Sequence, residues 1–330
     1  MPDGDSPTIR IDGDGGGGVV GFTPPTPDVL NAVLEGFEVH GVIGQGGMGA
    51  VYRGTQKRLD RTVAIKVMPV DLCVEHRFAD RFEREAKAMA KLSHQGVVPV
   101  YDFGDIDLPD GTRIMFLVME YVDGVDLHQL IQARELTLDR SLSIVSQICE
   151  AIAYAHSIGI IHRDIKPANV LVDVNRGDAV KVADFGLAKF RGWAQPSMIT
   201  RDDFAMGSPD YVAPESLEMG VKVDMRADVY SLGVVLYQLL TGKVPRGNYA
   251  APSKVNPVLN RQFDKIVDSA MATDREKRYQ TIEELHAAIK KIDKPATNSP
   301  SEVSGIRWPW IAAAAVGIGV IVLLIIYLAS

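Results

Sequence analysis

Residues 160–172, with the sequence IIHRDIKPANVLV, place a cluster of polar side chains between two apolar runs. The cluster consists of an acid, two cations and an amide, which are Asp164, Arg163, Lys166 and Asn169. Apolar runs of this kind are normally buried, and burial of charged groups is unfavourable unless each group is paired or meets a ligand. The pattern therefore favours a loop that faces a charged ligand and is anchored by its apolar flanks.

Charge and cysteine usage narrow the classes of function. The formal net charge is −7, and residues 1–36 hold six acidic residues against one basic residue. The rest of the chain is therefore close to neutral, whereas a nucleic-acid partner would need a strongly basic surface. The two cysteines, Cys73 and Cys149, do not suggest a disulfide framework. We expect a protein without nucleic-acid partners whose main part lies in a reducing cytosol.

Shifts in composition divide the chain into segments. The first residues are rich in glycine, proline and acid, which predicts disorder. Short β-branched and aromatic runs then predict an antiparallel sheet, and helical patterns follow it. The expected segments are a disordered arm at 1–36, a domain at 37–292 with a β-rich lobe (37–121) and a helical lobe (122–292), a linker at 293–307, and a membrane-spanning helix at 308–328.

Apolar periodicity predicts three helices within the domain. One helix carries an inward stripe that includes a glutamate, Glu85, among large apolar residues. A second is apolar nearly all round at residues 229–242, which predicts a buried core helix because it is too short to span a bilayer. The predicted stripes are Phe78, Phe82, Glu85, Met89 and Leu92 in the first helix and Val145, Ile148, Cys149 and Ile152 in the third.

Residues 311–328 contain no charged side chain. A helix of this length spans about 27 Å at about 1.5 Å per residue, close to the roughly 30 Å hydrocarbon core. Trp308, Trp310 and Tyr327 flank it, and lysines and an arginine precede it, so the positive-inside rule predicts a single pass with the domain in the cytoplasm. Ala315 and Gly319 would suit a homodimer, although an alanine-rich span gives such pairs by chance.

A glycine-rich stretch, GQGGMG, gives Gly44, Gly46 and Gly49 the spacing G-x-G-x-x-G. Such glycines let backbone N–H groups approach phosphate oxygens closely. A plain tight turn has the same composition, and a dinucleotide-binding unit would need a helix directly after the loop. Two strand-like runs follow instead, so we expect the tip of a hairpin that folds over a phosphate.

Two further patterns supply charge for a phosphate ligand. Lys66 ends the apolar run VAIK, and Glu85 can hold its ammonium as a fixed point charge. Asn169 and Asp184 offer hard oxygen ligands, which suit magnesium. Asp164 can then orient a hydroxyl and accept its proton, while Lys166 neutralises charge on the transferred group.

The order of these motifs resembles the eukaryotic-type (Hanks-type) serine/threonine protein kinase family. GQGGMG, VAIK, the inward glutamate, HRDIKPAN, DFG and APE follow one another between residues 37 and 292. The glycine-rich opening and the C-terminal span further resemble bacterial transmembrane kinases. The resemblance implies an α+β fold of two lobes, ATP with Mg²⁺ (or Mn²⁺) as cofactors, and transfer of the γ-phosphoryl group to serine or threonine of proteins, the chain's own activation segment included.

The resemblance also implies roles for individual residues. Asp164 would be the catalytic base, helped by Lys166, and Asn169 and Asp184 the metal ligands. Met119 would be the gatekeeper. The expected phosphate contacts are Gly44, Gly46, Gly47, Gly49 and Lys66, and Glu85 would pair with Lys66. The expected contacts of the adenine ring are Ile43, Val51 and Ala64 on its faces and Glu120 and Val122 at its edge. Asp126 would lie at the ribose. Glu215 would pair with Arg278, and Asp228 would brace the catalytic loop.

Regulation and departures from the family pattern complete the expectations. Arg163 beside the catalytic acid resembles kinases switched by phosphorylation, and Thr200 is the preferred site over Ser197 and Ser208. Gln95 and Gly96 replace the family's usual proline and asparagine in a turn. The stretch at 241–267 looks shortened where the family has a docking helix. A membrane-anchored pseudokinase scaffold is the alternative function, disfavoured because the catalytic set is complete.

Overall fold

A computed structural model describes residues 22–46, 49–70, 78–186, 209–218 and 220–292. The chain divides into two units, residues 1–292 and 293–330. None of the helices in the described ranges combines the length and the apolar character needed to cross a bilayer, and the span expected at 308–328 lies outside them.

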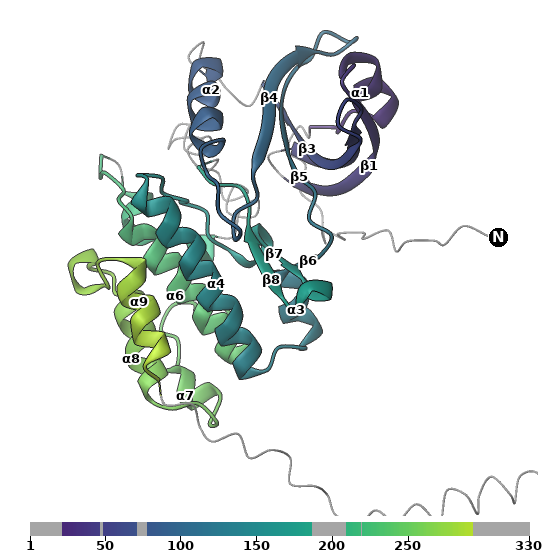
Figure 1. The fold of residues 1–330 in the computed structure, drawn as a ribbon. Helices are drawn as coiled ribbons and strands as arrows, with labels where there is room; N and C mark the ends of the chain where they lie inside the picture. The colour runs from purple at the N-terminus through teal and green to yellow at the C-terminus, as the bar shows by residue number, and fades with distance from the viewer. Residues whose placement is uncertain (1–21, 47–48, 71–77, 187–208, 219, 293–330) are drawn as a thin grey trace, which may run out of the picture. The chain divides into compact units, whose positions relative to one another are not determined.

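The N-terminal lobe is an antiparallel sheet with one long helix beside it (Figure 1). Its strands are β1 (Phe37–Gly46), β2 (Gly49–Gln56), β3 (Arg61–Pro69), β4 (Val100–Asp107) and β5 (Arg113–Glu120). They lie in the order β1-β2-β3-β5-β4. The helix is α2 (Phe78–Met89), whose residues Phe82 and Met89 are buried, as the predicted stripe requires.

A short helix, α1 (Pro27–Val33), precedes the sheet, so the disordered arm expected to reach residue 36 is corrected at its C-terminal end. Leu30 on α1 is fully buried against β1 and β2. The amide of Asn31 bonds both backbone groups of Val39, donating to its carbonyl at 3.0 Å and accepting its N–H at 2.7 Å. Because β1 is an edge strand, this contact satisfies groups that would otherwise face solvent. A helix of seven residues is too short for apolar periodicity to reveal it in the sequence.

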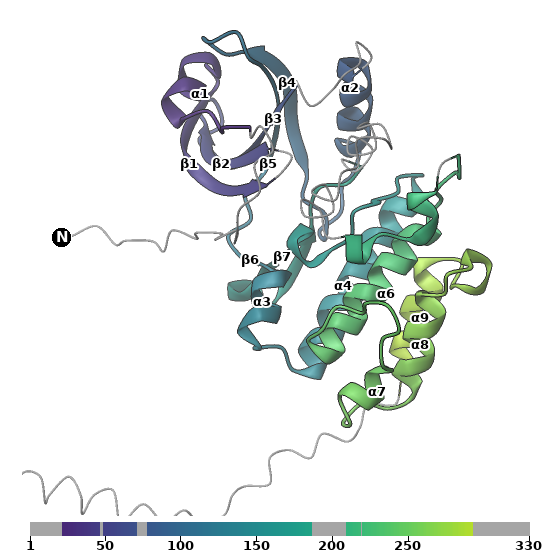
Figure 2. The ribbon, with the colours of Figure 1, turned by 180° about the vertical axis from the view of Figure 1, so that it is seen from behind.

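The C-terminal lobe is helical, with a small β unit on the side facing the N-terminal lobe (Figures 1 and 2). Its helices are α3 (Leu127–Ala133), α4 (Leu138–Ser157), α6 (Arg226–Thr241), α7 (Pro252–Val255), α8 (Gln262–Ala270) and α9 (Ile282–Lys290). The β unit consists of β6 (Val125–Asp126), β7 (Val170–Asp173) and β8 (Ala179–Val182). This arrangement is the bilobal fold expected from the motifs.

Two predicted helices form the core of this lobe. In α4 the predicted stripe of Val145, Ile148, Cys149 and Ile152 is fully buried. In α6 most side chains are buried, which confirms that residues 229–242 belong to a core helix. Gly242 ends α6 with φ +72°, and only the single turn of α7 precedes α8. The connection between α6 and α8, residues 242–261, is thus mostly irregular.

The turn after α2 attaches the sheet to the helical lobe. Val98 donates its N–H to the carbonyl of Val182 (2.9 Å), and Val182 donates to the carbonyl of Gly96 (2.8 Å). A Cβ on Gly96 would lie 3.1 Å from the Cβ of Ala151, so little room exists for a larger residue there. The unusual glycine at this turn therefore allows close packing between the two lobes.

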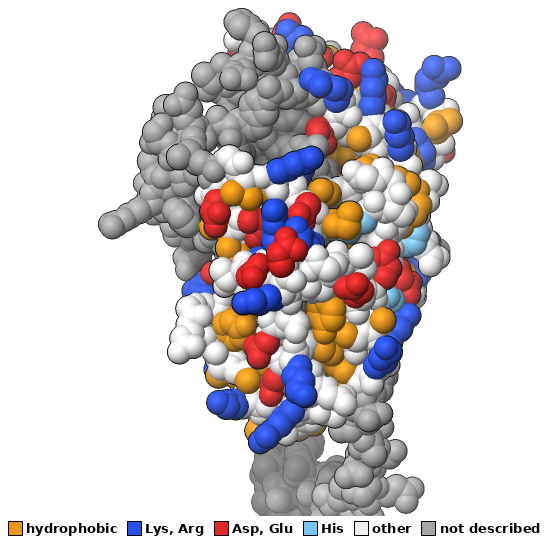
Figure 3. All heavy atoms as spheres, turned by 90° about the vertical axis from the view of Figure 1, so that its left-hand side faces the viewer, with side chains coloured by type: hydrophobic (Ala, Val, Ile, Leu, Met, Phe, Trp, Pro, Cys, Tyr) orange, Lys and Arg blue, Asp and Glu red, His pale blue; other side chains and the backbone are white. Residues whose placement is uncertain are grey.

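Charged side chains of both signs alternate on the face drawn in Figure 3. Several of the described ion pairs have both partners exposed, and such pairs contribute little to stability. The stability of the domain therefore depends mainly on its two apolar clusters, a large one that runs through the helical lobe and a smaller one under α1.

The last two glycines of the G-x-G-x-x-G motif, Gly46 and Gly49, make different demands on the backbone. Gly49 has φ +141°, and a Cβ there would lie 2.0 Å from the carbonyl oxygen of Val67. We predict that Gly49→Ala lowers the free energy of unfolding by about 1–3 kcal/mol from backbone strain alone. Gly46→Ala is the matched control, because its Cβ would meet no described atom within 4 Å. Urea unfolding measures both, and equal losses would contradict the prediction.

Candidate active site

A buried carboxylate holds the start of the polar loop, residues 162–169. Asp228 on α6 is fully buried and accepts the backbone N–H groups of His162 and Arg163, each at 2.8 Å. The Nε2 of His156 lies 2.7 Å from the same carboxylate. These contacts hold Arg163 at φ +67°, a conformation that a non-glycine residue rarely adopts. The predicted brace by Asp228 is confirmed.

His162 connects the polar loop with the DFG turn, residues 184–186. Its Nε2 donates to the carbonyl of Ala183 (2.9 Å), and its Nδ1 accepts the N–H of Asp164 (3.2 Å). Since one nitrogen donates and the other accepts, the ring is the neutral tautomer with its proton on Nε2. The ring of Phe185 packs on it with centroids 4.5 Å apart. The two segments are therefore linked through the side chain of His162.

Asp164 lies among polar groups of its own loop. The side-chain amide of Asn169 donates to the Asp164 carbonyl (2.7 Å) and to its Oδ2 (3.0 Å), and the ammonium of Lys166 lies 3.0 Å from the same Oδ2. Asn169 thus commits its nitrogen to Asp164 and keeps its amide oxygen for another partner. The side chain of Asp164 is 14% exposed, enough to be reached from outside.

Asp184 faces Lys66 across the space between the lobes. The Lys66 ammonium donates to Asp184 Oδ2 at 2.7 Å. Burial disfavours the charged carboxylate, but the charge and hydrogen bond of Lys66 oppose it, and the pKa of Asp184 is held below its usual value. The N–H of Ala183 donates to the Asn169 carbonyl (2.9 Å), which brings Asp184 and Asn169 together.

Lys66 has a described partner that the sequence analysis did not name. The sequence led us to expect a bond to Glu85, but the ion pair formed by Lys66 within the described residues is with Asp184. Glu85 is nevertheless close, because a Cβ on Gly186 would lie 3.2 Å from Glu85 Oε2. The carboxylates of Asp184 and Glu85 therefore both lie near the DFG turn.

The walls expected around a nucleotide ring come from strands in register. Val51 on β2 pairs with Lys66 on β3, and Ala64 on β3 pairs with Met119 on β5. Ala64 and Met119 are buried, while Val51 and Ile43 are partly buried. Gly44 and Gly46 end β1, Gly49 begins β2, and Gly47 lies outside the described residues.

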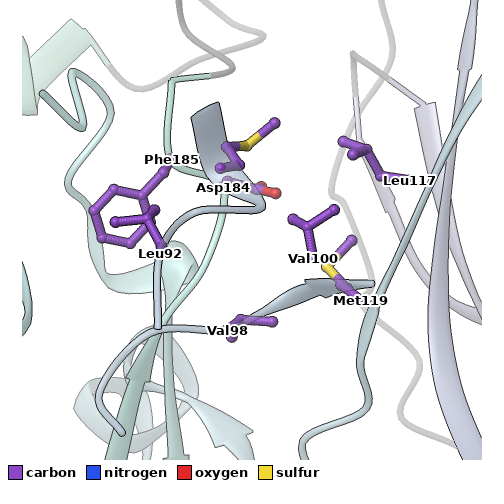
Figure 4. A pocket seen from close by; sticks show the side chains of 8 residues that line it. Leu92, Val98, Val100, Leu117, Met119, Asp184 and Phe185 are labelled. Atoms are coloured by element: carbon purple, nitrogen blue, oxygen red, sulfur yellow. The ribbon is translucent and has the colours of Figure 1, made fainter. Parts of the chain in front are cut away.

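A pocket lies behind Met119 (Figure 4). Apolar side chains from the sheet, from the turn after α2 and from Phe185 line it, and Asp184 is its single charged group. The sequence analysis did not select its other lining residues for function, because they look like ordinary core. These residues are Met89, Leu92, Val98, Val100 and Leu117.

The connection between the lobes contains a salt bridge that the sequence analysis missed. Glu120 Oε2 lies 2.7 Å from the ammonium of Lys181 on β8. Asp126 accepts the N–H of Gln129 at 2.8 Å and so caps α3. Burial raises the pKa of Asp126, and the cap and a nearby charge only partly oppose that effect. Val122 accepts a bond from Gly124 (3.1 Å), which turns the chain between them.

Glu215 and Arg278 form the predicted ion pair. Both are buried, and the guanidinium makes two hydrogen bonds of 2.7 Å to the two carboxylate oxygens. Arg278 also donates to the carbonyls of Ala272 and Arg226 (2.7 and 3.1 Å). This network ties the APE segment to α6 and to the turn before α9.

Comparison with known proteins identifies the class. A sequence model of the protein kinase domain matches residues 37–301. The chain therefore belongs to the protein kinase domain family, whose members use ATP and Mg²⁺.

Relatives place the chain near bacterial serine/threonine kinases. It is 39% identical over 269 residues to a probable serine/threonine-protein kinase of Streptomyces coelicolor, covering 77% of this chain and 39% of the relative. It is 37% identical over 282 residues to the serine/threonine-protein kinase PknB of Mycobacterium tuberculosis, covering 81% of this chain and 44% of PknB. The chain spans less than half the length of these curated relatives.

Solved structures agree with the fold. The kinase domain of PknI from Mycobacterium tuberculosis superposes with a TM-score of 0.61 at 30% identity, covering 77% of this chain and 95% of that domain. A single-substitution variant of the same domain gives a TM-score of 0.63 at 30% identity, covering 77% and 94%.

The contribution of the Glu215–Arg278 pair to the stability of the fold should depend on pH. Burial favours the neutral carboxyl, but the hydrogen bonds and charge of Arg278 outweigh it and hold the pKa of Glu215 below its usual 4.5. A carboxyl whose pKa is lower in the folded state than in the unfolded state stabilises the fold at pH values above the unfolded-state pKa. This contribution is lost as the pH falls through the folded-state pKa. Glu215→Gln should cost about 3–5 kcal/mol at neutral pH, and the difference from wild type should shrink below about pH 4.5.

Denaturant unfolding at a series of pH values measures this difference. Glu218→Gln is the control, because Glu218 is exposed and its replacement should change stability by less than about 0.5 kcal/mol. A cost of Glu215→Gln that stays constant from pH 7 to pH 3 would contradict the role assigned to the ion pair.

Proposed function

We propose that the chain is a protein kinase that transfers the γ-phosphoryl group of Mg-ATP to serine or threonine hydroxyls of proteins. One observation carries the proposal. Asp164, Lys166 and Asn169 form one polar group on the helical lobe, and a single backbone hydrogen bond from Ala183 to Asn169 sets the Asp184–Lys66 pair beside it. A base, a metal-ligand pair and a phosphate-binding cation thus lie together between the lobes.

The residues present fit the expected metal and nucleotide. Asp184 is held in its ionised form, and Asn169 keeps an amide oxygen, so both offer the hard oxygen ligands that Mg²⁺ prefers, with Mn²⁺ as an alternative ion. When bound, the ion neutralises charge that develops on the phosphoryl group. Lys66 supplies a positive charge from β3, and the strands that end in Gly46 and begin at Gly49 bring their backbone toward the phosphates.

The roles follow from what each side chain already holds. Asp164 is fixed by Asn169 and Lys166, so its carboxylate is oriented before a hydroxyl arrives, and it accepts the proton of that hydroxyl. Lys166 lies beside the same oxygen and offsets negative charge on the group in transit. The ring would pack between Ala64, Val51 and Ile43, with Glu120 and Val122 at its edge and Asp126 at the ribose.

The salt bridge between Lys66 and Asp184 is part of the same proposal. A cation that binds Asp184 competes with Lys66 for its carboxylate, and a phosphate competes for the ammonium. Glu85, already close to Gly186, is the carboxylate that we propose Lys66 meets once nucleotide is bound. The predicted Lys66–Glu85 pair would then belong to the loaded state.

Replacement of the proposed base tests the function directly. Asp164→Asn keeps the shape of the side chain and removes its proton-accepting charge, so we expect phosphate transfer to fall by about 10²–10⁴-fold. Nucleotide affinity should change little, because Asp164 is assigned to the hydroxyl. The full chain in detergent, Mg²⁺ and labelled ATP, with label counted on serine and threonine, measures transfer.

Asp107→Asn is the control, since Asp107 is an exposed residue at the end of β4. Wild-type chain that binds ATP yet labels neither itself nor added protein would favour the alternative, a pseudokinase scaffold. Transfer that survives Asp164→Asn unchanged would remove Asp164 from the role of base.

Membrane attachment and phosphorylation are further parts of this proposal. We propose that residues 308–328 cross the membrane once, with the kinase domain in the cytoplasm. This proposal does not depend on whether the chain forms a homodimer. Arg163 supports regulation, because its Nε is buried and has no hydrogen-bond partner in the described structure. A phosphate on Thr200 would supply one. The mapped phosphorylation sites and the activity of Thr200→Ala test this part.

A further inference from the structure

An ion pair with one exposed partner joins the connection after α6, residues 242–261, to the turn at residues 209–211. Arg246 donates from Nε to Asp210 Oδ1 at 3.0 Å and from a terminal nitrogen to Oδ2 at 2.7 Å. The two side chains differ in exposure, because Arg246 is 75% exposed and Asp210 only 18%. A molecule that approaches this surface therefore meets the guanidinium, and the carboxylate is covered.

The turn at 209–211 lies on the same side of α6 as the polar loop. Asp228 holds the polar loop, Ser231 donates to the carbonyl of Tyr211 (2.7 Å), and Gln238 accepts from the hydroxyl of Tyr211 (2.5 Å). Positions 228, 231 and 238 share one face of the helix at about 100° per residue, and about 4.5 Å of axial rise separates the first two. Asp210 therefore follows the side of α6 that also holds the polar loop, and Arg246 lies there through its pair with Asp210.

A protein substrate must lie over this surface. The nucleotide side of Asp164 is the side of Lys66 and Asp184, so the acceptor hydroxyl has to arrive from the other side. Because one face of α6 holds both the polar loop and the 209–211 turn, we infer that the residues next to that hydroxyl pass this turn. Asp210 is neutralised by its partner, and Gln238 carries no charge, so the exposed charge that we identify at this turn is that of Arg246.

We propose that Arg246 is a specificity-determining residue that favours acidic residues next to the acceptor serine or threonine. The inference rests on the proposed kinase function and adds the substrate class. Asp210 acts as the positioning residue, since two parallel hydrogen bonds fix the plane of the guanidinium and leave its other terminal nitrogen for a substrate carboxylate. The same pairing keeps Asp210 from attracting basic residues.

Paired peptides test the proposal. Each pair has one acceptor and differs only by Glu or Lys at one neighbouring position, scanned on both sides. With the full chain in detergent, we expect the Glu peptide to be preferred in kcat/KM by about two- to fivefold at one or more positions, the range of an exposed ion pair. The preference should lie in KM, because the contact binds ground state and transition state alike.

Charge reversal should reverse the preference. Arg246→Glu should make the enzyme prefer the Lys peptide, and the milder Arg246→Gln should remove the preference between Glu and Lys peptides. Both variants should fold normally, since the Arg246 side chain is exposed. Asp210→Asn should weaken the preference without reversing it. Lys243→Glu, an exposed cation of the same connection, is the matched control and should leave the preference unchanged.

The outcomes separate the two proposals. The specificity role of Arg246 is overturned if Arg246→Glu keeps the preference of the wild type, or if it lowers kcat/KM equally for the Glu and Lys peptides. The ion pair would then serve only to hold the two segments together. Absence of transfer by the wild type to any peptide and to its own residues overturns the proposed kinase function, and the specificity inference with it.

Discussion

The buried carboxylate of Asp228 is the interaction on which the rest of the site depends. A charge without solvent contact is unfavourable unless donors surround it, and here two backbone N–H groups and a histidine nitrogen do so. Those donors belong to the polar loop and to α4, so the loop takes its shape from the most buried helix of the lobe. Positive φ at Arg163, which costs on the order of 1–3 kcal/mol, persists because the carboxylate fixes both neighbouring amides.

Helix α6 serves as a common support for several functional segments. Asp228 holds the polar loop, Ser231 and Gln238 hold the turn at 209–211, and the carbonyl of Arg226 accepts from Arg278, the partner of Glu215. Each segment is irregular and would not keep one conformation alone. Because one buried helix holds them all, the positions of the polar loop, the APE segment and the turn at 209–211 are set together.

Much of this arrangement could be predicted from the sequence, and the failures have physical reasons. The stripe of α4 and the apolar surface of α6 were predictable because periodicity reports burial directly. Helix α1 escaped because seven residues carry too little periodicity, and its stability comes from contacts with β1. The pairs Glu120–Lys181 and Asp210–Arg246 escaped because 61 and 36 residues separate their members, and charge pattern alone does not select such partners.

Lys66 shows a different limit, because its two possible partners are both present. Asp184 holds the ammonium at 2.7 Å, while Glu85 lies beside Gly186, two residues further along the same turn. The sequence shows that both carboxylates are present, but it does not show which of them Lys66 binds. That choice depends on the cations and phosphates in the site. His162 ties the position of Asp184 to the polar loop through the carbonyl of Ala183, and Phe185 packs on the same ring. The His162 side chain thus links the turn that contains Asp184, the partner of Lys66, to the loop that contains Asp164.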